Sequence, residues 1–121
     1  MADAQKHVLI VEDEKALSHA LELKLTHEGF LVTIASNGQE CLDLVATQHF
    51  DVLLLDLIMP VMDGFQVLEK LGAKTSQTAV FVLSNLSQHE DEERVLSLGA
   101  RKFFIKSDTP LTTIVDEVRK A

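Results

Sequence analysis

Five short apolar runs, separated by amphipathic stretches, constrain the fold of this chain more than any other feature. They lie at residues 8–11, 31–34, 52–55, 80–83 and 102–105 and are rich in Val, Leu, Ile and Phe. Runs of this length without polar alternation are typical of strands buried on both faces, as in a parallel sheet. Because amphipathic stretches alternate with the runs, the pattern predicts an α/β fold, a doubly wound five-stranded parallel sheet with helices on both faces.

The stretches between the runs carry helix signals. Leu17, Leu21 and Leu25 share one face of a predicted helix over 15–28, and Gly29 is a typical residue just past a helix end. The pair Asn37–Gly38 could form a hairpin turn, but residues 40–46 lack strand alternation, so Asn37 is predicted to cap a second helix. Further helices are expected at 65–71, at 88–98, and from Pro110 onward.

Composition limits the function. The 121 residues suit one domain spanning 1–121. A net charge of −8 argues against direct binding of nucleic acid or of anionic membranes, and favours a metal as any bound cation. The single cysteine, Cys41, excludes an internal disulfide and fits a reducing, cytoplasmic location. No apolar run approaches the ~20 residues of a membrane helix.

Polar residues follow four of the five runs, at the point where each predicted strand ends. Glu12 and Asp13 follow the first run, Asp56 the third, Ser84 the fourth and Lys106 the fifth. Because the carboxyl ends of parallel strands meet at one edge of the sheet, these side chains are expected to lie together. Each residue alone is typical of a solvated loop, but the four matched positions together indicate a site.

The residue types at this edge suit phosphoryl chemistry. Neighbouring carboxylates repel one another, and Mg²⁺ relieves that repulsion while binding carboxylate oxygens. A carboxylate beside Mg²⁺ can attack a phosphoryl group and form an aspartyl phosphate. Lys106 can supply positive charge to the transferring group, and Ser84 can donate a hydrogen bond to it.

Four stretches resemble the receiver domain of two-component response regulators, and the resemblance covers nearly the whole chain. They are VLIVEDE at 8–14, DLIMPVMDG at 56–64, VLS at 82–84 and GARKFFIK at 99–106. The resemblance implies a flavodoxin-like (βα)5 sheet of order 2-1-3-4-5. It also implies a cytoplasmic signalling protein in which Asp56 accepts a phosphoryl group from a sensor histidine kinase or a phosphotransfer protein.

The resemblance assigns roles to single residues. Glu12, Asp13, Asp56 and the backbone carbonyl of Ile58 would hold Mg²⁺, and Lys106 would pair with the phosphoryl group.

Two further residues would act as switches. Ser84 would turn inward to bond the phosphoryl group, and Phe103 lies where the family has its aromatic switch residue. Output would occur by docking to an unknown protein through the face of the fourth helix, fifth strand and fifth helix. The sequence leaves open whether the chain forms a homodimer and whether it is excised from a longer protein.

Three departures from the family pattern lead to expectations. The Lys106–Ser107 peptide lacks the family's usual proline and is expected to be trans. Asn85 replaces the small residue that the family favours, and is expected to narrow access to Asp56. Ile58 and Leu86 are both apolar, and in the family these two positions flank the path of the hydrolytic water. The apolar residues predict slow hydrolysis of the aspartyl phosphate.

Other functions fit the sequence less well. A haloacid-dehalogenase-type phosphohydrolase needs a second Asp two residues after the nucleophile, where this chain has Ile58. A flavodoxin-like FMN carrier shares the fold, but the first loop is acidic and the chain has no Trp or Tyr. A receiver that docks without phosphate is favoured by Asn85 and Ser107, and opposed by the complete set of strand-end residues.

Several residues have ordinary structural interpretations. The five histidines lack zinc-ligand spacing and are expected at the surface. Adjacent Phe103 and Phe104 should point to opposite faces, with one of them in the core. Cys41 is expected to be a small buried hydrophobe, and Glu90–Glu93 a solvated first turn of a helix.

Overall fold

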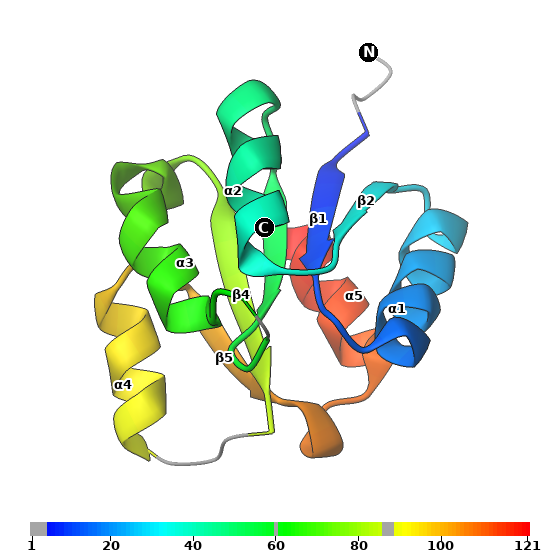
Figure 1. Ribbon diagram of the computed structural model, residues 1–121. Helices are drawn as coiled ribbons and strands as arrows, with labels where there is room; N and C mark the ends of the chain where they lie inside the picture. The colour runs from blue at the N-terminus through cyan, green and yellow to red at the C-terminus, as the bar shows by residue number, and fades with distance from the viewer. Residues whose placement is uncertain (1–4, 60, 86–88) are drawn as a thin grey trace.

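A computed structural model describes residues 5–59, 61–85 and 89–121 and shows three layers, with a central sheet between two sets of helices (Figure 1). The strands are β1 His7–Val11, β2 Leu31–Ala35, β3 Val52–Asp56, β4 Ala79–Ser84 and β5 Lys102–Ile105. The α-helices are α1 Lys15–His27, α2 Gly38–Thr47, α3 Gly64–Leu71, α4 His89–Ser97 and α5 Leu111–Lys120. Two 3-10 helices, η1 Gly72–Ser76 and η2 Lys106–Asp108, follow α3 and β5.

The sheet is parallel throughout and has the order β2-β1-β3-β4-β5. Both the predicted doubly wound fold and the strand order are therefore confirmed. In the register, Asp56 lies beside Leu83, and Ser84 lies beside Ile105. The strands consequently end almost level with one another, which places their following residues at one edge of the sheet.

The sheet is apolar on both faces because each face is covered by helices. Leu53 and Leu55 of β3 pack on the side of α2, α3 and α4, while Val52 and Leu54 pack on the side of α1 and α5. All four side chains are essentially inaccessible to solvent. Since burying one such side chain contributes about 1.5–3 kcal/mol, the two cores hold the sheet rigidly beneath the edge where the strands end.

The helix ends follow local sequence signals. Asn37 Oδ1 accepts a hydrogen bond from Glu40 N at 2.9 Å, which confirms the predicted cap of α2. Gly29 has a φ of 98° and follows the end of α1, where a residue with a side chain would be strained. Pro110 is the N-cap of α5 rather than its first helical residue, which corrects the predicted start by one position.

Two expectations about single aromatic residues need correction. Neither Phe103 nor Phe104 is fully buried, because β5 is an edge strand. They do point to opposite faces, as predicted, and pack against different cores. His7 is half-buried rather than at the surface, since its ring lies 4.5 Å from that of Phe50 and its Nε2 lies 2.7 Å from Thr33 Oγ1.

Other expectations hold. Cys41 is inaccessible to solvent, and burial raises the pKa of its thiol to about 12. His19, His27 and His49 are exposed, while the side chain of His89 lies outside the described residues. In the part of the chain that the structure describes, no helix has the length and apolar character needed to cross a bilayer.

Candidate functional site

A cleft of about 350 Å³ lies at the carboxyl edge of the sheet. It is lined by Glu12, Asp13, Glu14, Asp56, Ile58, Ser84, Asn85 and Lys106. The structure thus brings together every predicted site residue except Phe103. Phe103 is half-buried on β5 and packs against the α2, α3 and α4 side of the sheet.

Two buried carboxylates share one ammonium group at the bottom of the cleft. Lys106 Nζ lies 2.8 Å from Glu12 Oε1 and 3.3 Å from Asp56 Oδ1. Only 3% of Glu12 and 4% of Asp56 is exposed to solvent. The three groups therefore carry a net negative charge when all are ionised, in a place where water screens it poorly.

Burial sets the protonation of this cluster. Loss of solvent raises the pKa of Glu12 and of Asp56 above their usual values, although Lys106 acts against that shift in both cases. Burial also acts to lower the pKa of Lys106, but Glu12 and Asp56 outweigh it and raise the pKa overall. Lys106 is accordingly held as a cation, while the two carboxyl groups resist carrying both of their charges.

Backbone groups fix the two buried carboxylates. Glu12 Oε2 accepts from Glu14 N at 3.1 Å, and Asp56 Oδ1 accepts a longer bond from Ile58 N at 3.4 Å. Glu12 N donates to Ala35 O at 3.0 Å, which ties the end of β1 to the end of β2. The first two bonds orient the carboxylate oxygens, and the third fixes the backbone of Glu12.

The carboxylates are close enough to share a cation. Glu12, Asp13 and Asp56 each offer a carboxylate oxygen, and these oxygens all lie within 4.8 Å of one another. Asp13 is exposed, whereas the other two are buried. A hard divalent ion such as Mg²⁺ binds oxygen ligands of this kind and retains several waters, so the donor set and its excess of negative charge fit Mg²⁺.

The start of α3 packs directly on the backbone of Asp56, and sequence analysis did not foresee this contact. A Cβ placed on Gly64 would lie 2.6 Å from Asp56 O and 2.7 Å from Leu57 Cα. Gly64 N donates to Leu57 O at 2.8 Å. Residue 64 must lack a side chain for α3 to approach this closely. The Asp63–Gly64 pair was the available signal, but by itself it indicates only a helix start.

The remaining strand-end residues lie where they were expected. Ser84 is fully buried at the end of β4 and lines the cleft, next to exposed Asn85. The described residues contain no cis peptide bond, so Lys106–Ser107 is trans, as predicted. Leu86, the second apolar residue proposed to flank the hydrolytic water, lies outside the described residues.

A second cavity, of about 270 Å³, lies at the opposite end of the sheet, next to Phe50 and Val80. Polar groups in its lining already bond the chain's own backbone. Lys74 Nζ donates to Val45 O at 3.2 Å, and Thr78 Oγ1 donates to Phe50 O at 2.8 Å. The cleft at the carboxyl edge is the better candidate because its charged groups face one another and the cleft.

A flavodoxin-like parallel sheet with an acidic cleft and a lysine at its carboxyl edge is the arrangement expected for a receiver domain. The model of the response regulator receiver domain matches residues 8–118, and the chain therefore belongs to that family. Receiver domains are mainly signalling switches in which phosphorylation and Mg²⁺ binding are typical, and their partners are histidine kinases or phosphotransfer proteins. The family match favours a signalling domain over the phosphohydrolase and flavin-carrier hypotheses.

Curated relatives support this placement. The chain is 39% identical over 100 residues to the uncharacterized transcriptional regulatory protein YkoG of Bacillus subtilis, covering 83% of this chain and 44% of that protein. It is 36% identical over 99 residues to the cell cycle response regulator CtrA of Brucella ovis, covering 82% of this chain and 43% of that protein. The chain thus spans less than half the length of these relatives.

Solved structures agree with the fold. The receiver domain of the Francisella response regulator 1452 superposes with a TM-score of 0.89 at 28% identity, covering 96% of this chain and 95% of that one. The response regulator TrrA of Thermotoga maritima, solved in complex with Mg²⁺ and BeF, gives a TM-score of 0.83 at 26% identity, covering 96% and 98%. A receiver domain of Methanospirillum hungatei shares the fold with a TM-score of 0.90 at 24% identity, covering 97% and 93%.

Proposed function

We propose that this chain is a Mg²⁺-dependent switch that accepts a phosphoryl group on Asp56 from a histidine kinase or a phosphotransfer protein. One observation carries the proposal: Lys106 Nζ lies 2.8 Å from Glu12 and 3.3 Å from Asp56, both of which are buried at the edge of the sheet. A buried carboxylate that opens only toward a cleft, with a cation beside it, suits attack on an anionic group.

The proposed transfer is a displacement at phosphorus. A carboxylate oxygen of Asp56 forms a bond to the phosphorus of a phosphohistidine, and the bond from phosphorus to the imidazole nitrogen breaks. The other ring nitrogen of the phosphohistidine carries a proton in this step, so the imidazole leaves with that electron pair as a neutral ring and no oxidant is needed. Lys106 stays charged and pairs with the phosphoryl oxygens, while Ser84 donates a hydrogen bond to one of them.

The residues proposed to bind Mg²⁺ are Glu12, Asp13, Asp56 and the backbone carbonyl of Ile58. When bound, the ion offsets the negative charge of the carboxylates and of the incoming phosphoryl group. Glu12 and Asp13 contribute charge without attacking phosphorus. Glu12 is already oriented by Glu14 N, and it also holds Lys106 in place.

Output is proposed to occur by docking of another protein on α4, β5 and α5. Phe103 lies half-buried on β5 and is the proposed aromatic switch residue. Lys102 of β5 and Glu117 of α5 form an ion pair of 2.9 Å across this face. A phosphoryl group adds about −1.5 to −2 charge in the cleft, and it would bias the position of Ser84 and Phe103.

The first test is the intact mass of the protein after incubation with Mg²⁺ and acetyl phosphate. We expect one added phosphoryl group, absent in Asp56→Asn and in the presence of EDTA. Asp43→Asn is the matched control, because Asp43 is exposed on α2 and bonds only Gln39 among the described contacts. Absence of the adduct with this donor and with a histidine kinase would instead favour a receiver that docks without phosphate.

The lifetime of the aspartyl phosphate is proposed to be long because Ile58 lines the cleft. Its side chain is 59% exposed and cannot orient a water molecule by hydrogen bonding. Ile58→Asn is expected to accelerate decay of the mass adduct after the donor is removed. An unchanged decay rate would contradict this role of Ile58.

A further inference from the structure

We propose that Gly38, the first residue of α2, is a positioning residue for the loop that carries Ile58. This inference rests on the proposed Mg²⁺ site, for which the Ile58 carbonyl is a suggested ligand. The loop in question joins β3 to α3, and residues 57–59 and 61–63 of it are described. Gly38 lies outside the loop, does not line the cleft and contains no ligand group.

Gly38 packs against the far end of this loop at a distance that no side chain allows. A Cβ placed on residue 38 would lie 2.6 Å from Val67 Cγ2, 2.8 Å from Met62 O and 3.0 Å from Met62 Cβ. The second of these atoms belongs to the loop backbone. Any larger residue at 38 must therefore displace α2, α3 or the loop.

The first turn of α2 is held by its own hydrogen bonds. Asn37 Oδ1 accepts from Glu40 N at 2.9 Å. Glu40 Oε1 in turn accepts from Ser36 N at 2.7 Å and from Ser36 Oγ at 3.0 Å. These contacts bridge both sides of Gly38 and resist a shift of the turn.

The first turn of α3 is held in the same way. Asp63 and Gln66 form a reciprocal capping box, with Gln66 N to Asp63 Oδ1 at 2.9 Å and Asp63 N to Gln66 Oε1 at 3.1 Å. Val67 is fully buried. Gly64 also rests on Asp56 O, as described above. With both helices fixed, the loop is the part that moves when residue 38 gains a side chain.

The loop backbone is itself in an unfavourable conformation. Val61 has a φ of 71°, which a β-branched residue rarely adopts, and its side chain is 79% exposed. Nothing in the residue's own preference holds it there, so the surrounding packing must impose the conformation. The close approach of Gly38 to Met62 is one such restraint that comes from outside the loop and α3.

Displacement of the loop would reach the metal site through Ile58. Ile58 N donates to Asp56 Oδ1 at 3.4 Å, and Ile58 follows Asp56 by two residues. We expect a shift at Met62 to change both the orientation of Asp56 and the position of the Ile58 carbonyl, and the amide signal of Ile58 reports that change. Changes to groups behind metal ligands typically weaken metal binding by roughly 10–100-fold.

The test is a Mg²⁺ titration of the whole chain. Binding is monitored through the amide signal of Ile58 in NMR spectra. Gly38→Ala is expected to bind Mg²⁺ about tenfold more weakly than the wild type, and to shift the Ile58 amide signal before any Mg²⁺ is added. Gly29→Ala is the matched control. An alanine at position 29 would be strained by the φ of 98°, but its Cβ would lie more than 4 Å from the surrounding atoms. This variant should therefore lower the free energy of unfolding without contacting the loop.

A double variant keeps the test decisive if Gly38→Ala alone does not fold. Val67→Ala removes the nearest atom to a new Cβ, while Met62 O stays in place. We expect Gly38→Ala/Val67→Ala to keep the weakened Mg²⁺ affinity of Gly38→Ala. We expect Val67→Ala alone to bind Mg²⁺ with the affinity of the wild type. Recovery of wild-type affinity in the double variant would overturn the proposal, because the effect would then run through α3 rather than the loop.

The outcomes separate this inference from the proposed function. If the wild type shows no Mg²⁺-dependent shift at Ile58, the proposed Mg²⁺ site fails, and the inference fails with it. If the wild type binds Mg²⁺ and Gly38→Ala binds equally well, with stability lowered as in Gly29→Ala, only the positioning role of Gly38 is overturned.

Discussion

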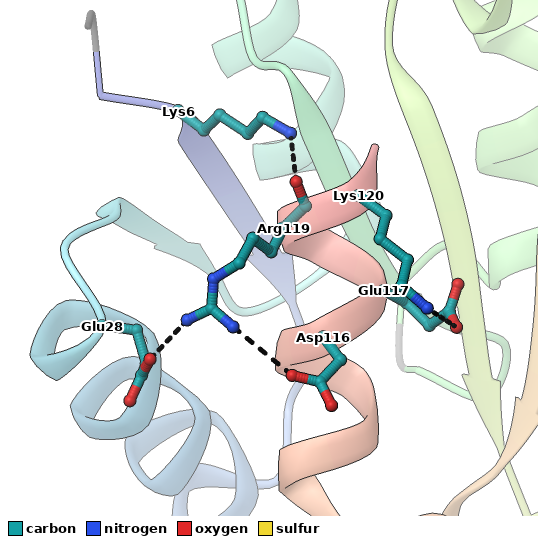
Figure 2. Close-up of polar contacts among 6 residues, drawn as sticks. All are labelled: Lys6, Glu28, Asp116, Glu117, Arg119 and Lys120. Carbon is teal, nitrogen blue, oxygen red and sulfur yellow. Dashed lines mark hydrogen bonds and ion pairs between the residues drawn. The ribbon is translucent and has the colours of Figure 1, made fainter.

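Two lysines at opposite ends of the sheet are used in opposite ways. Lys106 lies at the carboxyl edge, where its ammonium group meets the buried carboxylates of Glu12 and Asp56. Lys6 lies just before β1, at the amino edge, and its ammonium group donates to backbone oxygens of Val118, Arg119 and Ala121 at the end of α5 (Figure 2). The first cluster has more negative than positive charge, whereas the second satisfies acceptors that every helix end leaves free.

The Lys6 cluster closes the end of α5. Lys6 Nζ donates to Val118 O at 3.3 Å, to Arg119 O at 2.9 Å and to Ala121 O. Arg119 pairs with Glu28, just past α1, and lies 3.4 Å from Asp116. Figure 2 shows Lys6 reaching to a backbone oxygen near the end of α5, and Arg119 reaching from α5 to Glu28 and to Asp116. Their positive charge lies at the negative end of a helix dipole, which is favourable.

The comparison shows where stability is given up for function. At Lys106 burial raises the pKa of both carboxyl groups, so their ionisation opposes folding. At Lys6 the ammonium group meets backbone oxygens at a helix end, and no buried side-chain carboxylate takes part in these contacts. We therefore expect substitutions at the two lysines to have effects of different size and different pH dependence.

The largest effect is expected for Lys106→Met. This variant leaves Glu12 and Asp56 buried without a cation, which should lower the free energy of unfolding by about 3 kcal/mol at pH 8. The loss should shrink as the pH falls, because the two carboxyl groups then gain protons and lose their charge. Urea unfolding of the metal-free protein at pH 8 and pH 5 measures both values.

A second substitution checks the cause. Adding Asp56→Asn to Lys106→Met should recover much of the lost stability, since only one buried carboxylate then remains. Equal stability of Lys106→Met and the wild type at pH 8 would show that the cleft is solvated well enough to hold both charges, and the contrast between the two lysines would fail at its first step.

Asp56→Asn alone should stabilise the metal-free protein by about 1 kcal/mol at neutral pH. A folded-state pKa above the unfolded value means that the native protein keeps a proton that the unfolded chain has lost. Wild-type stability therefore falls as the pH rises from the unfolded pKa toward the folded one, and the advantage of the variant grows over the same window. Paired urea titrations from pH 4 to pH 8 test this sign.

Mg²⁺ should reverse the order of these two proteins. A ligand that binds only the native state adds to its stability according to concentration and affinity, and the wild type should gain more than Asp56→Asn. Asp116→Asn is a suitable control, since that carboxylate is exposed. A stability advantage of Asp56→Asn that persists unchanged in saturating Mg²⁺ would argue against binding at this cleft.

The same contrast explains what could be predicted from the sequence. The Lys106 cluster follows from a rule of the fold, since Glu12, Asp56 and Lys106 each come directly after an apolar run. Parallel strands then bring such residues to one edge regardless of the detailed packing. The central strands β3 and β4 were predictable because they are apolar on both faces, and each of the five apolar runs is bounded by polar residues.

The Lys6 cluster could not be predicted in this way. Its acceptors are backbone carbonyls 112 to 115 residues away, and carbonyl groups have no sequence signature. The close contacts of Gly38 and Gly64 could not be predicted for a similar reason. A glycine in the sequence does not indicate which atoms of the fold pack against it. The half-burial of Phe103 and Phe104 depended on β5 lying at the sheet edge.

Lys6→Met should lower the free energy of unfolding by about 1 kcal/mol, less than Lys106→Met. The long side chain can still cover the end of α5, so the loss reflects the hydrogen bonds to its carbonyls. The effect should be the same at pH 5 and pH 8, since no titrating carboxylate is released. Hydrogen exchange should accelerate in the last turn of α5 and stay unchanged in β3. Faster exchange at Asp56 would indicate that the two ends of the sheet are coupled.

Arg119→Gln should have the smallest effect, a loss of about 0.5 kcal/mol or less. Arg119 is about half-exposed, so water and salt screen its pairs with Glu28 and Asp116. The loss should disappear at 1 M NaCl, where the screening length is about 3 Å. Most of the loss in Lys6→Met should persist, because Val118 O and Arg119 O are uncharged carbonyl oxygens. Urea unfolding of both variants at low and high salt makes this distinction. If both losses vanish together in salt, the Lys6 contacts act through the negative charge around α5 rather than as a cap of its carbonyls.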